Sequence, residues 1–188
     1  MKGFKNTWIV TEEGLRKTSF TYDQHFITIG RDEEGLEELP EDYAIVPGFI
    51  DEHVHGAAGS DAMDGTKEDL TKIANALASE GTTSFLATTM TQSPENITKA
   101  LTTIKNYIDD KPVTGAEILG VHLEGPFISK DFVGAQPLEY VAIPSIETFK
   151  KYQSASGNNI RIVTLAPEVE GSSELIKYLK DNNIVASI

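Results

Sequence analysis

Residues 44–55 read AIVPGFIDEHVH, an apolar run that ends in two histidines separated by one residue. The run from Ala44 to Ile50 is typical of a buried strand of a parallel sheet, because such strands carry short continuous apolar segments. Along an extended strand, residues i and i+2 point to the same side. His53 and His55 are therefore expected to face one common ligand at the end of this strand.

Downstream of these residues, apolar β-branched segments alternate with amphipathic segments of helical period. The expected strands centre near Ile45, Ser84, Leu119, Val163 and Val185, and the expected helices lie between Thr66 and Gly81, Ser93 and Ile108, Ser145 and Gln153, and Ser173 and Leu179. This alternation predicts an α/β protein built from βα units around a parallel sheet. Polar residues gather after the strands, at the edge where both a (β/α)₈ barrel and a doubly wound sheet place their ligands. The pattern alone fits either architecture.

Upstream, short segments rich in β-branched and aromatic residues predict strands at Thr7–Val10, Lys17–Tyr22 and His25–Ile29. An acidic stretch from Arg31 to Asp42 follows, which we expect to be a surface loop. We therefore predict an N-terminal β-strand segment over residues 1–42 and the βα units over residues 43–188. The last expected strand, residues 184–188, has no helix after it, so we expect the chain to be a truncated, N-terminal part of a longer protein.

The composition excludes several classes of function. The formal net charge of −13 argues against binding to nucleic acid or to an anionic membrane, since both need basic surfaces. No apolar run approaches the roughly 18 residues of a membrane span, so we expect no membrane insertion and a cytoplasmic location. The chain has no cysteine, so any metal ligands must be histidines and carboxylates.

A second chemically suggestive segment is GVHLEGPF at residues 120–127. Glu124 ends an apolar strand and precedes a Gly-Pro turn, which places its carboxylate at the same edge of the sheet as His53 and His55. Two imidazoles and one carboxylate suit zinc and similar divalent ions. His122 shares the strand face of Glu124, and it could orient this carboxylate or could simply be a packed histidine.

Taken together, VPGFIDxHxHG at residues 46–56 and HLEGPF at residues 122–127 resemble the amidohydrolase superfamily, and within it the N-acetylglucosamine-6-phosphate deacetylases. Three further segments are similar to that family, namely MDGT at 63–66, TTSF at 82–85 and GAQP at 134–137. The likeness spans the whole chain, and the HLEGPF segment is the most specific part of it.

The resemblance implies a distorted (β/α)₈ TIM-type barrel, of which this chain supplies about the first five βα units, preceded by strands of a small β domain. It implies that His53, His55 and Glu124 are ligands of one or two divalent metal ions such as Zn, Fe or Mn. It also implies that Gln136 lies near the acetamido group of the substrate, with Ala135 beside it in the pocket. The implied reaction is deacetylation of an amino-sugar phosphate in amino-sugar catabolism.

In the family, further metal-binding histidines, the aspartate that transfers protons and most phosphate-binding groups come from later strands. The resemblance therefore implies that the chain needs a C-terminal half of the barrel, is inactive alone, and belongs to an enzyme that forms a homodimer. Two alternatives remain open. The protein could be another amidohydrolase that acts on a cyclic amide or an N-acyl amino acid, for which HLEGPF is not expected, or a non-catalytic half-barrel remnant.

Overall fold

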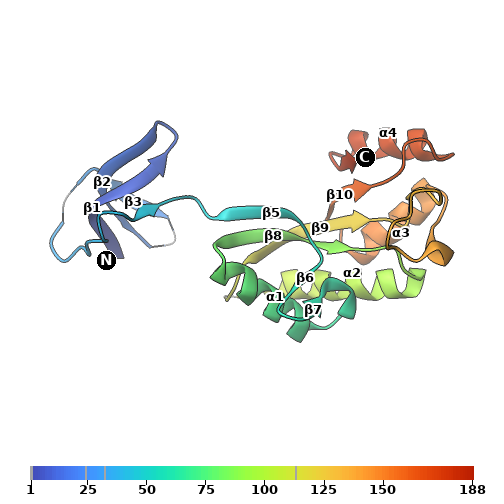
Figure 1. Cartoon of the computed structure of the whole chain (residues 1–188), viewed down its shortest axis with the longest axis horizontal. Coiled ribbons are helices and arrows are strands. Elements are labelled where there is room, and N and C mark those ends of the chain that lie inside the picture. Colours follow the sequence, from blue (N-terminus) through green and yellow to red (C-terminus); the bar gives the residue numbers. More distant parts are fainter. Residues whose placement is uncertain (1, 24, 32, 113) are drawn as a thin grey trace. The chain divides into compact units, whose positions relative to one another are not determined.

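A computed structural model describes residues 2–23, 25–31, 33–112 and 114–188 (Figure 1). The chain divides into two compact units, residues 1–48 and residues 49–188.

The first unit is a four-stranded sheet of order β3-β2-β1-β4, in which β4 alone pairs in parallel. Its strands are β1 (Lys2–Thr11), β2 (Gly14–Tyr22), β3 (Phe26–Ile29) and β4 (Ala44–Ile45). The predicted N-terminal strands are thus present, with β1 longer than the pattern indicated. The acidic stretch is largely exposed, but Leu36 is buried and the amide of Lys5 donates to the carbonyl of Glu37.

The placement of Ile45 in the parallel sheet was wrong, because the apolar run from Ala44 to Ile50 forms two strands and not one. Residues 44–45 pair with β1, whereas the first parallel strand is β5 (Phe49–Val54). Pro47 lies between them, and a proline has no amide hydrogen to donate to a strand ladder. The expected burial of the run is also wrong at Phe49 and Ile50, whose exposed fractions are both 65%.

The second unit contains a five-stranded, all-parallel sheet of order β11-β10-β9-β8-β5. The strands after β5 are β8 (Thr82–Thr89), β9 (Glu117–Glu124), β10 (Ile160–Thr164) and β11 (Val185–Ser187). The helices between them are α1 (Lys67–Ser79), α2 (Pro94–Asp110), α3 (Ile146–Ala155) and α4 (Ser172–Asp181). Each strand neighbours the next one along the chain, as in a (β/α)₈ barrel, whereas a doubly wound sheet reverses its strand order. The predicted α/β class is confirmed, and the sheet is the first part of a TIM-type barrel.

Short elements fill two of the loops. The hairpin of β6 (Gly56–Ala57) and β7 (Ser60–Asp61) leads into the 3₁₀ turn η1 (Ala62–Asp64). A second 3₁₀ turn, η2 (Leu138–Tyr140), lies in the long loop between β9 and α3. Both insertions lie after a strand, on the ligand-binding edge of the sheet.

The helices begin where the sequence indicated. The hydroxyl oxygens of Thr66, Ser93 and Ser145 each accept the backbone amide hydrogen three residues on, which satisfies an otherwise unpaired donor of the first turn. Gly81, at φ +90°, ends α1. In Figure 1, α1 and α2 run along the strands β8 and β9 that they cover, and the apolar faces of these helices are buried against the sheet.

The carboxylate of Asp69 also stabilises the start of α1. Hydrogen bonds from the hydroxyl groups of Thr66 and Ser60, and then from Lys72, hold the pKa of Asp69 at about 2, below its ordinary 3.8.

In the parts of the chain that the structure describes, no helix is both long enough and apolar enough to cross a membrane.

Candidate metal centre

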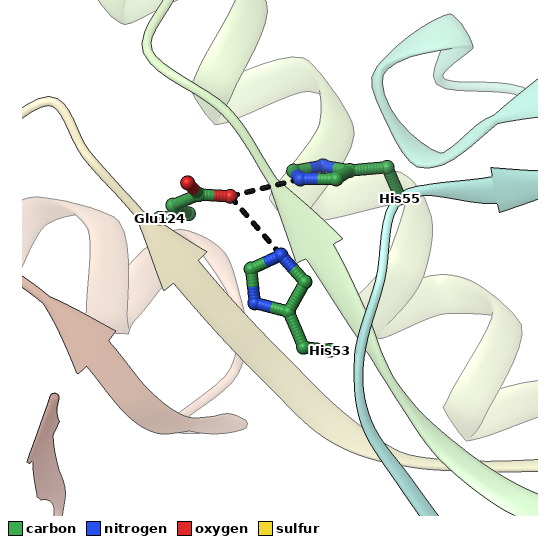
Figure 2. A group of neighbouring side chains, drawn as sticks. All are labelled: His53, His55 and Glu124. Atoms are coloured by element: carbon green, nitrogen blue, oxygen red, sulfur yellow. Dashed lines mark ion pairs between the residues drawn. The ribbon is translucent and has the colours of Figure 1, made fainter. Parts of the chain in front are cut away.

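Three potential ligands come together at the carboxyl-terminal edge of the parallel sheet (Figure 2). His53 lies in β5, His55 follows directly after it, and Glu124 ends β9. Because β8 lies between β5 and β9, the side chains meet above the end of β8. Nε2 of His55 lies 2.8 Å from Oε2 of Glu124, and Nε2 of His53 lies 3.4 Å from the same oxygen.

This donor set fits a divalent cation. One ligand atom from each residue lies within 4.8 Å of the others. Oε2 of Glu124 is buried and accepts no hydrogen bond from the described residues, although two imidazole nitrogens face it. Two histidines and a glutamate form a set that zinc enzymes use for catalysis, since three protein ligands leave one coordination position for water or substrate.

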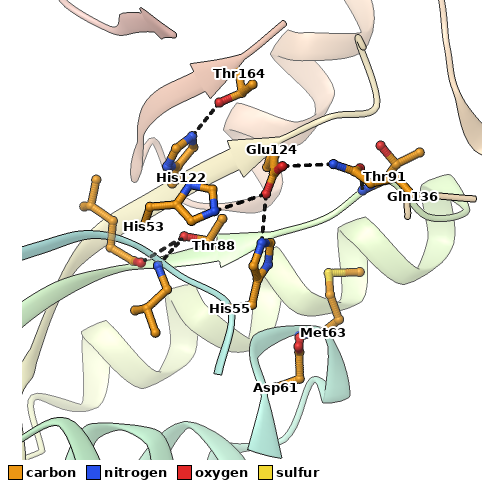
Figure 3. A network of polar contacts seen from close by, with 12 residues as sticks. His53, His55, Asp61, Met63, Thr88, Thr91, His122, Glu124, Gln136 and Thr164 are labelled. Atoms are coloured by element: carbon orange, nitrogen blue, oxygen red, sulfur yellow. Dashed lines mark hydrogen bonds and ion pairs between the residues drawn. The ribbon is translucent and has the colours of Figure 1, made fainter. Parts of the chain in front are cut away.

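The other carboxylate oxygen of Glu124 is fixed by Gln136 (Figure 3). Nε2 of Gln136 donates to Oε1 of Glu124 at 3.0 Å, and Oε1 of Gln136 accepts the backbone amide hydrogen of Thr91 at 2.9 Å. The amide of Gln136 therefore links the loop after β8 to the loop after β9. Ala135, the other residue expected to contact substrate, is exposed next to it.

Glycine is required at position 125, directly after the carboxylate. Gly125 has φ +71°, and a Cβ atom there would lie 2.0 Å from Oγ1 of Thr91 and 3.2 Å from Oε1 of Gln136. The backbone of this turn thus passes against the same hydrogen-bonded group that orients Glu124. The Gly-Pro turn noted in the sequence has a steric reason.

His122 does not hydrogen-bond to Glu124. Its ring is buried, and Nδ1 lies 2.9 Å from the backbone oxygen of Glu52. Nε2 lies 2.8 Å from Oγ1 of Thr164 (Figure 3). Burial lowers the pKa of His122, so the neutral ring is favoured. A carbonyl oxygen can only accept, so Nδ1 carries the proton and Nε2 accepts from the hydroxyl of Thr164. Of the two readings that the sequence left open, a packed and hydrogen-bonded histidine is the one observed.

Sequence reasoning did not single out the threonines around the centre. The hydroxyl of Thr88 accepts the amide hydrogen of Val54, the residue between the two histidines, at 3.0 Å. Thr91 and Thr164 contact Gln136 and His122, respectively. The only signal available was that polar residues follow β8 and β10, and it did not show which hydroxyl faces which neighbour.

The barrel-type sheet and the convergence of two histidines and a glutamate at its edge can now be compared with known proteins. Residues 44–182 match the model of the Amidohydrolase family, and the chain belongs to that family.

Among characterised relatives, the chain is 46% identical over 153 residues to N-acetylglucosamine-6-phosphate deacetylase of Bacillus subtilis, covering 80% of this chain and 39% of that protein. It is 38% identical over 140 residues to N-acetylgalactosamine-6-phosphate deacetylase of Escherichia coli O157:H7, covering 74% of this chain and 37% of that protein. The chain thus spans well under half the length of these relatives.

The chain is also similar to solved structures along almost its whole length. The structure of N-acetylglucosamine-6-phosphate deacetylase from Thermotoga maritima superposes with a TM-score of 0.81 at 32% identity, covering 98% of this chain and 47% of that one. The enzyme of that name from Mycobacterium smegmatis superposes with a TM-score of 0.84 at 23% identity and shares the fold.

Proposed function

We propose that this chain is the N-terminal part of a divalent-metal-dependent hydrolase that removes the N-acetyl group from N-acetylglucosamine 6-phosphate, releasing glucosamine 6-phosphate and acetate. The observation that carries the proposal is the convergence of His53, His55 and Glu124 at the ligand-binding edge of the sheet. The Bacillus subtilis relative, which is 46% identical over 153 residues, bears the name of that deacetylase.

In this proposal His53, His55 and Glu124 hold one or two ions such as Zn, Fe or Mn. When bound, a divalent cation supplies Lewis-acid chemistry, which polarises a carbonyl oxygen and makes water reactive at neutral pH. The chain's own part is to present the three ligands in a fixed arrangement. Gln136 holds the Glu124 carboxylate through its amide NH₂. Its proposed place near the acetamido group of the substrate rests on the resemblance to the deacetylases, and its contact with Glu124 supports that place.

The partner of this half barrel is proposed to be the rest of a barrel. The strands β5 and β11 lie at the two ends of the sheet order, and each pairs with a single strand among the described residues. In a (β/α)₈ barrel three further strands join such ends. Apolar side chains at these ends, including Phe49, Ile50 and Val185, are exposed here and would pack against the added βα units.

Two further expectations belong to the same proposal. We expect the whole protein to form a homodimer and to be located in the cytoplasm, and both rest on the resemblance and the composition described above. An amino-sugar phosphate as substrate is consistent with the names of the relatives.

The test is a chimaera in which the part of the Bacillus subtilis relative that this chain does not match follows Ile188. Acetate release from N-acetylglucosamine 6-phosphate is measured for the chimaera, for its Glu124→Ala variant and for the 188-residue chain alone. The proposal predicts turnover by the chimaera, loss of turnover in the variant and upon chelation, and none by the isolated chain. A folded, metal-loaded chimaera without deacetylase activity would refute it.

A second candidate substrate, which differs in the sugar, is suggested by the name of one relative. One relative at 38% identity acts, by its name, on N-acetylgalactosamine 6-phosphate, which differs from the proposed substrate at one ring carbon. The assay therefore includes that epimer, together with a cyclic amide and an N-acyl amino acid. Preferential turnover of either of the last two would replace the deacetylase assignment with another amidohydrolase activity.

A further inference from the structure

The strand that carries the two histidines pairs irregularly with β8 at two places, between Phe49 and Ile50 and again where it reaches His53. In the pairing of β5 with β8, Asp51 lies opposite Phe85 and Val54 lies opposite Ala87, so three steps along β5 match two steps along β8. One extra residue in a strand is a β-bulge, a feature that turns side chains to new directions beside active sites. Here the extra residue falls within Glu52-His53, immediately before or at the first ligand.

A bulge leaves backbone amide and carbonyl groups without partners in the strand ladder. In this segment side chains form hydrogen bonds with those groups. The amide of His53 donates to Oδ1 of Asp51 at 3.0 Å. The amide of Val54 donates to Oγ1 of Thr88 at 3.0 Å. The carbonyl of Glu52 accepts from Nδ1 of His122. Asp51 belongs to the same strand, whereas Thr88 and His122 reach in from β8 and β9.

Both outside groups are themselves held in one orientation. Thr88 is fully buried, and its hydroxyl also donates to the carbonyl of Leu86 at 3.3 Å, which leaves its lone pairs for Val54. The His122 ring accepts from Thr164 through Nε2, which keeps the proton on the nitrogen that faces β5. The ring of His122 also packs edge-on against His53, with 4.8 Å between ring centroids and an interplanar angle of 88°.

We propose that Thr88 and His122 are positioning residues of the metal centre, which fix the bulged backbone so that both imidazoles stay directed at Glu124. This inference rests on the proposed metal site. A ligand site tolerates deviations of only about 0.2 Å in ligand distance, so freedom in the His53-Val54-His55 backbone lowers the fraction of molecules ready to bind. Groups that orient metal ligands contribute roughly 10–100-fold to metal affinity.

Thr89 provides a matched control for Thr88. It is the next residue in β8, it is equally buried, and its hydroxyl has no hydrogen-bond partner among the described residues. Replacing either threonine by valine keeps the shape and removes the hydroxyl. Only the change at Thr88 removes a contact to the segment that carries the histidines.

The experiment compares Co²⁺ affinity in the wild-type chain and in Thr88→Val, Thr88→Ser and Thr89→Val, with thermal unfolding measured in chelator for each. We expect Thr88→Val to weaken binding about 10–100-fold, and Thr88→Ser and Thr89→Val to stay within about threefold of wild type. His122→Leu should act like Thr88→Val, whereas His122→Asn, which retains a donor near the Nδ1 position, should recover part of the loss. Equal affinity in Thr88→Val and Thr89→Val would overturn the proposal.

A second measurement tests the positioning role of Thr88 independently of metal binding. Amide hydrogen exchange at Val54 is followed in the metal-free chain, and Thr88→Val should accelerate it about tenfold while Thr89→Val leaves it unchanged. A wild-type chain that binds no Co²⁺ would defeat the metal site. Exchange at Val54 that does not respond to Thr88→Val would defeat the positioning role, whatever the metal result.

Discussion

Replacing Gln136 by methionine should weaken the metal centre without removing a ligand. The side chain keeps nearly the same volume, but Glu124 loses the donor at 3.0 Å and the amide of Thr91 loses its acceptor at 2.9 Å. A hydrogen bond to a charged group contributes about 1.5–3 kcal/mol. If most of that loss appears as misorientation of Glu124, metal affinity falls about 10–100-fold, because each factor of ten corresponds to about 1.4 kcal/mol.

The assay is a competition titration of Co²⁺ or Zn²⁺ against a chromophoric chelator, with thermal unfolding in excess chelator as a measure of stability. A loss of about 1–2 kcal/mol should lower the Tm by roughly 2–8 °C in a chain of this size. The control is Gln153→Met. The Gln153 amide pairs with both backbone groups of Ile160 at the start of β10, the opposite end of the sheet from the centre.

Gln153→Met should therefore lower the Tm while metal affinity stays unchanged. Gln136→Met should lower both. The reasoning is refuted if the two variants show the same change in affinity, because Gln136 would then contribute to general stability and not to the orientation of Glu124.

Two further changes test the turn after Glu124 and the start of α1. Gly125→Ala should destabilise the chain and weaken metal binding, since its Cβ would lie 2.0 Å from Oγ1 of Thr91. The control is Gly134→Ala, which has a similar positive φ and no atom within 4 Å of the added Cβ, and which should therefore show the backbone strain alone. Equal effects of the two variants in thermal unfolding would contradict the steric argument. Asp69→Asn should be less stable than wild type at neutral pH, because hydrogen bonds, first that from Thr66, hold the folded-state pKa at about 2 against 3.8. This advantage of the wild type is present above the unfolded-state pKa and is lost as pH falls, so the difference in Tm should shrink between about pH 5 and pH 2, and a constant difference would disprove it.

The convergence of His53, His55 and Glu124 was largely predictable from the sequence because it depends on local rules. Alternation along a strand places His53 and His55 on one side, and parallel strands bring their carboxyl ends to one edge, where Glu124 ends β9. Helix starts at Thr66 and Ser93 follow from short-range capping. These features need no knowledge of which strands are neighbours.

Features that depend on tertiary contact were not predictable. The strand order that separates a barrel from a doubly wound sheet has no signature in periodicity, and the apolar character of residues 44–50 concealed the break at Pro47. The run of threonines at 88, 89 and 91 looks uniform in sequence, yet one hydroxyl holds Val54 and another has no partner among the described residues. The contacts of Gln136 depend on the path of the loop after Gly125. The substrate-binding roles of Ala135 and Gln136 remain predictions.

The most direct test of the account is X-ray absorption spectroscopy of the Zn²⁺-loaded chain. We expect zinc to be bound by two imidazole nitrogens at about 2.0–2.1 Å and a carboxylate oxygen at about 2.0–2.2 Å, and we expect imidazole scattering to be lost in the His53→Ala, His55→Ala double variant. A spectrum with only oxygen neighbours, or one that the double variant leaves unchanged, would contradict the assignment of His53, His55 and Glu124 as the metal centre.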